Sequence, residues 1–123
     1  MTVQELYESL GASYTEAKSR LMSDKLISKF VVKYLADPSY NELMAAWDAQ
    51  NEAEIFRMAH TLKGVAANLA LTKLFEAASE LTECYRPGQE SMRIGKDIPA
   101  LVQAVTDRYE ETVAAIRAFE AAQ

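Results

Sequence analysis

The chain has 123 residues, half of them hydrophobic and a quarter charged, which is the size and composition of one folded domain. Its formal net charge of -5 argues against nucleic-acid binding, since such proteins normally carry a basic patch. One cysteine and one histidine exclude an intramolecular disulfide framework and a zinc site built from Cys and His.

Apolar residues recur with helical spacing, and no segment alternates apolar and polar residues long enough for a strand, so an all-α fold is predicted. Two short helices are expected at residues 3–10 and 13–21, separated by Gly11. Ser23 can cap a helix over residues 24–36. The Asp37-Pro38 pair then favours a restart that runs to about residue 49, which gives one broken arm.

The second arm is predicted to begin after Asn51, which can cap it, and to end near Ala70, so that it covers about residues 52–70. Glu54 is placed to complete a capping box with Asn51. At about 100° per residue, the apolar side chains of this arm fall on one face. That predicted core face consists of Ile55, Met58, Ala59, Leu62, Val65, Ala66 and Leu69.

Two further arms complete the chain. Thr72 is the expected cap of a helix that stops at Pro87-Gly88, residues 88–96 are a predicted loop, and Asp97 opens a last helix to about residue 121. Four long arms with short connections predict an up-and-down four-helix bundle with short additional N-terminal helices, in a single domain.

His60 lies about 160° from the centre of the apolar face of its helix, so it is predicted to face solvent. Lys63, Gly64 and Ala67 share this side, which therefore carries an imidazole, an ammonium group and two very small side chains. A solvated helix face is ordinarily charged throughout. Glycine inside a helix costs about 1 kcal/mol relative to alanine, which indicates that a partner must approach the backbone beside His60.

The charge pattern around His60 differs from that of the rest of the chain. No Asp or Glu occurs from residue 55 to residue 75, whereas Arg57, Lys63 and Lys73 fall there. A metal site would place carboxylates near the histidine, and an anion such as phosphate favours cations. The pattern therefore predicts an anion at His60.

The run His60-Thr61-Leu62-Lys63-Gly64, preceded by Ala59 and followed by small residues, resembles the signature of histidine phosphotransfer (HPt) domains of bacterial phosphorelays. The likeness is specific over about one helix, and helix spacing extends it from residue 30 to residue 86. In that family the histidine carries a phosphoryl group between aspartates of receiver domains. The resemblance therefore implies phosphorylation at His60, a phosphate-supporting cation at Lys63 and clearance for the phosphoryl group at Gly64.

Partners and cofactors follow from the same resemblance. It implies response-regulator receiver domains and a hybrid sensor histidine kinase as partners, with Mg²⁺ bound by the receiver and no cofactor or metal in this chain. The chain has no glycine-rich nucleotide loop, so it is expected to be a phosphocarrier without kinase activity of its own. We expect a monomer in the cytoplasm that binds neither nucleic acid nor membrane, since neither a signal peptide nor an apolar stretch of about 20 residues is present.

A docking rim for the receiver is predicted around His60. The helical wheel places two apolar side chains within about 40° of the histidine and puts further residues on the same face or at its edges. The predicted rim consists of Phe56, Arg57, Ala67, Asn68 and Leu71.

Two positions depart from the family pattern. Members commonly have glycine where this chain has Ala70, which bears on where the histidine helix ends. Several have glutamine near the position of Thr82, which bears on a side-chain hydrogen bond to the imidazole.

The sequence leaves two other functions as alternatives. One is a non-catalytic adaptor of the same fold that binds receivers without relaying phosphate. The other is a bundle enclosing a metal or haem, but the di-metal pattern needs Glu-x-x-His motifs on more than one helix, and this chain has one histidine.

Overall fold

The computed structural model describes residues 1–123 and contains α-helices, one short 3₁₀ helix and no strand, so the predicted all-α class is confirmed. Three short helices come first: α1 (Val3–Ser9), α2 (Tyr14–Leu21) and α3 (Asp24–Tyr34). The longer part of the chain forms α4 (Ser39–Asp48), α5 (Glu52–Asn68), α6 (Thr72–Tyr85), the 3₁₀ helix η1 (Glu90–Arg93) and α7 (Ile98–Ala121).

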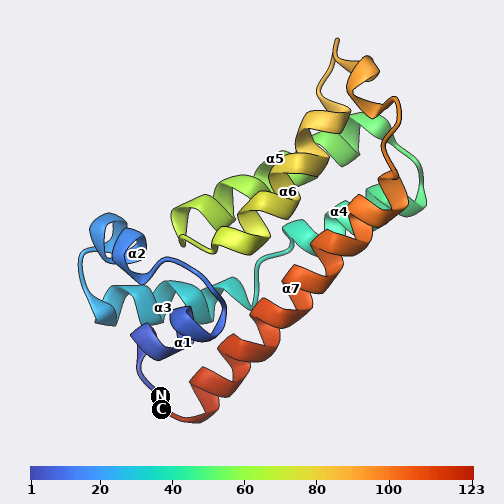
Figure 1. Cartoon of the computed structure of the whole chain (residues 1–123). Coiled ribbons are helices and arrows are strands. Elements are labelled where there is room, and N and C mark those ends of the chain that lie inside the picture. The colour runs from blue at the N-terminus through green and yellow to red at the C-terminus, as the bar shows by residue number, and fades with distance from the viewer.

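Helices α4 to α7 form the up-and-down bundle. Figure 1 shows α5 and α6 side by side, and α4 packs against α5 while α6 packs against α7. The short helices α1 and α3 pack against α7 toward its C-terminal end, where the two chain ends lie close together, and α2 packs on α1 and α3 (Figure 1). The two helices of the predicted broken arm, α3 and α4, therefore do not act as one arm. Helix α4 packs in the bundle, whereas α3 packs with α1, α2 and α7.

A single hydrophobic core joins the short helices to the bundle. Its 27 buried residues come from every helix from α1 to α7. The predicted core face of α5 is confirmed, with Val65 only half-buried at its edge. None of the helices combines the length and the apolar character that are needed to cross a lipid bilayer.

The N-termini of α5 and α4 show which of the predicted capping hydrogen bonds form. The Asn51 side chain accepts the Glu54 backbone N–H at 3.2 Å, as expected, but the Glu54 carboxylate turns to Arg57 and does not complete the capping box. Helix α4 starts one residue later than the sequence suggests, because Pro38 is the N-cap and the Asp37 carboxylate accepts the N–H of Ser39 at 2.9 Å.

Two expectations beyond α5 are corrected. Leu71, and not Thr72, is the N-cap of α6, and it provides no side-chain hydrogen bond. The predicted loop over residues 88–96 contains the 3₁₀ turn η1, whose Arg93 pairs with Glu52 at 2.9 Å.

Helix α5 ends at Asn68, two residues before the predicted end. Leu69 is the C-cap, and Ala70 follows with φ of +54°. The backbone N–H of Leu71 donates to the Ala66 carbonyl at 2.9 Å, and that of Ala70 donates to Ala67 at 3.1 Å. These two bonds define a Schellman motif, in which the left-handed residue is usually glycine. The chain reverses at this point and leads directly into α6.

Candidate functional site

His60 lies on α5 with its side chain exposed, on the side of the helix opposite the core. Its ring centre lies 5.6 Å from that of Phe56, with the two rings tilted by 58°. Gly64 follows one turn later, and a methyl group placed on it would meet no other atom within 4 Å. The histidine is therefore flanked on one side by an aromatic ring and on the other by open space over the helix backbone.

Lys63 does not extend freely into solvent. Its side chain is 27 % exposed, and its Nζ lies 3.8 Å from Oε1 of Glu83 on the neighbouring helix α6. The same nitrogen lies 5.9 Å from the ring centre of Phe75. The ammonium group is thus kept against α6, one turn along α5 from His60.

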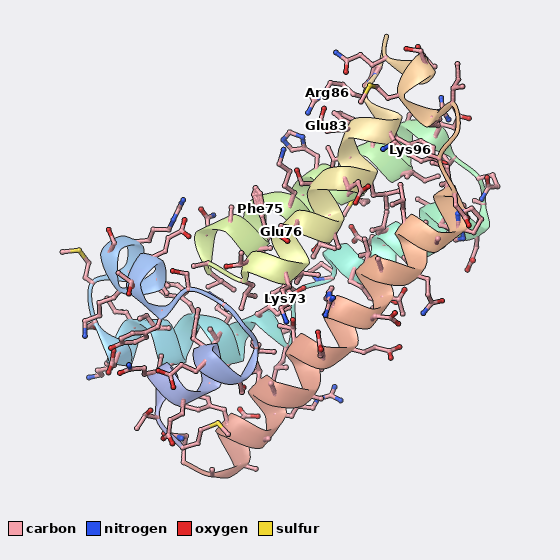
Figure 2. All side chains as sticks on the ribbon, in the orientation of Figure 1. Lys73, Phe75, Glu76, Glu83, Arg86 and Lys96 are labelled. Carbon is pink, nitrogen blue, oxygen red and sulfur yellow. The ribbon has the colours of Figure 1, made fainter.

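Two charged residues of α6, Glu83 and Arg86, join this surface and were not predicted from the sequence. The guanidinium of Arg86 donates to both carboxylate oxygens of Glu83, at 2.7 and 3.0 Å, and lies 5.4 Å from the ring centre of Phe56. Figure 2 shows the two side chains next to each other toward the C-terminal end of α6. Their i,i+3 spacing is visible in the sequence, but it does not tell which face of α6 turns toward α5.

The electrostatics of this surface centre on Glu83. Its hydrogen bonds from Arg86, and more weakly the charges of Lys63 and His60, hold the pKa of the Glu83 carboxyl below its ordinary value of 4.5. The surface therefore carries two cations and one carboxylate around His60. The expected cationic character of α5 is partly compensated by an acidic group from α6.

The position near Thr82 contributes no side chain to His60. Thr82 is fully buried, and its hydroxyl donates to the Ala78 carbonyl of its own helix at 2.7 Å. A hydrogen bond from this residue to the imidazole is absent.

The structure places the residues of the predicted docking rim in different surroundings. Phe56 is half-buried beside His60, and Ala67 lines a groove of about 380 Å³ whose opposite wall includes Arg20 of α2. Asn68 is exposed and lines a second groove, of about 320 Å³, against α3. These two rim residues border grooves to which helices outside the bundle contribute.

The other two rim residues are less available to a partner. Arg57 is exposed, but its guanidinium is paired with Glu54 at 2.7 Å. Leu71 is 2 % exposed and belongs to the core, so its predicted place in the rim is wrong. The helical wheel does not apply to Leu71, because α5 ends at Asn68 and the chain turns inward.

No group of three or more His, Cys, Asp or Glu side chains is arranged to hold a metal ion. The groups around His60 are instead suited to an anion, because Lys63 and Arg86 are both donors for phosphate oxygens.

A family model described as the Hpt domain matches residues 36–118. The chain belongs to this family. The matched range covers α4 to α6 and all of α7 except its last three residues, and it leaves α1 to α3 outside. Comparisons with curated proteins and with solved structures found no match. Hpt domains carry phosphoryl groups on histidine in phosphorelays and are not kinases, so this chain is a phosphocarrier.

Proposed function

We propose that this Hpt domain relays a phosphoryl group between receiver-domain aspartates through a phosphohistidine at His60. The observation that carries the proposal is the exposed His60 on the core-distal side of α5, with open space at Gly64 and a cation at Lys63 one turn away. An incoming phosphoaspartate must bring its own domain close to the helix backbone. The missing side chain at Gly64 leaves room for that approach.

The proposed transfer needs no base from this chain. One ring nitrogen of neutral His60 attacks the phosphorus with its lone pair, the bond from phosphorus to the aspartyl oxygen breaks, and the carboxylate leaves with that electron pair. The other ring nitrogen keeps its proton, so the ring carries a positive charge in the phosphorylated state. Onward transfer reverses these steps toward a second aspartate.

Lys63 is the proposed support for the transferred group. Its ammonium is a compact charge on a flexible stem, and it can move from Glu83 to a phosphoryl oxygen because the present distance of 3.8 Å is long for an ion pair. Mg²⁺ is expected in the receiver, whose carboxylates suit it, and this chain is expected to contribute no metal ligand.

The proposed partners are response-regulator receiver domains and a hybrid sensor histidine kinase. The receiver is expected to contact Phe56, Ala67 and Asn68, with Arg57 at the edge of the same face. The chain is proposed to act as a monomer, since one exposed histidine on one bundle is sufficient for the relay.

The test is phosphotransfer to the His60→Gln variant. A receiver domain charged with acetyl phosphate is mixed with the parent chain or with the variant, and acid-labile, base-stable phosphate on the chain is measured. The parent is expected to be labelled and the folded variant not, because His60 is exposed and its replacement leaves no cavity. Labelling of the variant would contradict the site. A parent that binds the receiver but takes no phosphate would point to the adaptor.

A further inference from the structure

Glu83 is the one carboxylate that is paired with both Lys63 and Arg86, the two cations on the surface around His60. It accepts two hydrogen bonds from Arg86, at 2.7 and 3.0 Å, and lies 3.8 Å from the ammonium of Lys63. The other two acidic residues of α6 that precede it, Glu76 and Glu80, form no ion pair. Glu83 therefore differs from its neighbours in its contacts, not in its residue type.

The contacts of Glu83 are also open to change. The side chains of Lys63, Glu83 and Arg86 are 27, 39 and 34 % exposed, so none of the three is locked in the core. Arg86 is held in a bidentate pair, whereas the Lys63 contact is longer and made by a single nitrogen. An anion arriving at His60 would compete with Glu83 for both cations, and for Lys63 first.

We propose that Glu83 disfavours the phosphorylated state of His60, because its negative charge repels the phosphoryl group and competes with it for Lys63 and Arg86, so that the phosphoryl group is passed on readily. This inference rests on the proposed phosphotransfer at His60. It adds that an acidic residue of α6 influences the equilibrium between phosphohistidine at His60 and aspartyl phosphate on the receiver.

The physical argument compares the two states of His60. Transfer forms a nitrogen–phosphorus bond and breaks the phosphorus–oxygen bond to the receiver aspartate, and it brings the negative phosphoryl oxygens to a surface that already contains the Glu83 carboxylate. A phosphoryl group next to Asp or Glu is destabilised by like-charge repulsion, and it is stabilised by Lys and Arg. Glu83 acts against the phosphohistidine in both ways, since it repels the phosphoryl group and occupies the two cations.

The experiment measures how phosphate divides between the two proteins. A receiver domain charged with acetyl phosphate is mixed with the parent chain or a variant, and the ratio of phosphohistidine to aspartyl phosphate is read at equilibrium on phosphate-affinity gels. Glu83→Gln is expected to raise this ratio about threefold to tenfold at low salt, because one repulsive charge near the surface is removed and two cations are released. The increase should shrink at about 0.5 M salt, which screens charges at this exposed site.

Two matched variants isolate the role of Glu83. Glu80→Gln removes the same charge one turn earlier on α6, from a side chain without an ion pair, and is expected to change the ratio less than about twofold. Glu83→Asp keeps the charge and is expected to restore a ratio near that of the parent. The replaced side chains are exposed or partly exposed, so each variant is expected to fold, and melting curves check this.

The outcomes separate this inference from the proposed function. If Glu83→Gln behaves like Glu80→Gln, or lowers the phosphohistidine ratio, the inference is overturned while the relay at His60 stands. A rise that Glu83→Asp shares would show that the charge is not the cause, and would also overturn it. If the parent takes up no phosphate from any receiver domain, the proposed function fails and the inference fails with it.

Discussion

The phenolic hydroxyl of Tyr7 donates a hydrogen bond of 2.6 Å to the backbone carbonyl of Leu69, 62 residues further along the chain. Tyr7 belongs to α1, outside the part of the chain that matches the Hpt family, and Leu69 is the C-cap of the helix that carries His60. A second bond, from the Ser13 backbone N–H to the Ala70 carbonyl at 3.3 Å, joins the same two regions. The N-terminal helices are thereby fastened to the end of α5.

Replacing Tyr7 by phenylalanine is expected to destabilise the fold by about 1–3 kcal/mol, because the buried Leu69 carbonyl loses its partner. Urea denaturation measures this loss. The matched control is Tyr14→Phe, which removes a hydrogen bond of the same length, 2.6 Å, to the exposed Asp24, and should cost less than about 1 kcal/mol because water can replace it. Equal losses for the two variants would mean that the Tyr7 bond has no special role.

Lys63→Ala is expected to slow phosphotransfer without unfolding the chain. A charge-assisted contact to phosphate is worth about 1.5–3 kcal/mol, which corresponds to a roughly 10- to 100-fold change in rate. Single-turnover transfer from a charged receiver measures it. Lys73→Ala is the control, since Lys73 is an exposed lysine that lies against Gly11, away from His60. A rate for Lys63→Ala that equals the parent rate would leave Lys63 with no part in the transfer.

The sequence predicted the exposed side of α5 correctly because each residue of a single helix is rotated by about 100° from the one before. His60 and Gly64 follow from the 100° step alone, and both are exposed in the structure. Glu83 and Arg86 could not be found in this way, because their position depends on how α6 is rotated and shifted against α5. The same period misplaces Leu71 for a related reason, since α5 ends at Asn68 and the 100° step does not continue to residue 71.

The residues with positive φ give a second stability test. Gln50 has φ of +52° and is exposed after α4, and Ala70 has φ of +54° but is only 3 % exposed after α5. A left-handed conformation costs a non-glycine residue about 1–2 kcal/mol, part of which is offset by the greater freedom of glycine in the unfolded chain. Gln50→Gly is therefore expected to stabilise the fold by about 0.5–1 kcal/mol.

Ala70→Gly should gain less than Gln50→Gly, because it also loses a buried methyl group worth about 0.8 kcal/mol. Thermal and urea denaturation of the two variants side by side give the comparison. A larger gain for Ala70→Gly would indicate that the end of α5 is more strained than its Schellman hydrogen bonds suggest.

The last prediction concerns Gly64, where helix stability and phosphotransfer are expected to change in opposite directions. Alanine is favoured over glycine inside a helix by about 0.5–1 kcal/mol, glutamine is also a good helix former, and no atom lies within 4 Å of the added Cβ position. Gly64→Ala and Gly64→Gln should therefore melt at or above the parent temperature.

Their phosphotransfer should nevertheless fall in the order parent, Gly64→Ala, Gly64→Gln, because the new side chain occupies the space that the phosphoryl group and its receiver need beside His60. Ala114→Gln on the exposed side of α7 adds the same side chain elsewhere and should transfer at the parent rate. If Gly64→Gln transfers as fast as the parent, then clearance at Gly64 has no role in docking. If Gly64→Gln unfolds, the fold itself needs glycine at this position for the packing of α5, and the prediction that Gly64 faces open solvent is wrong.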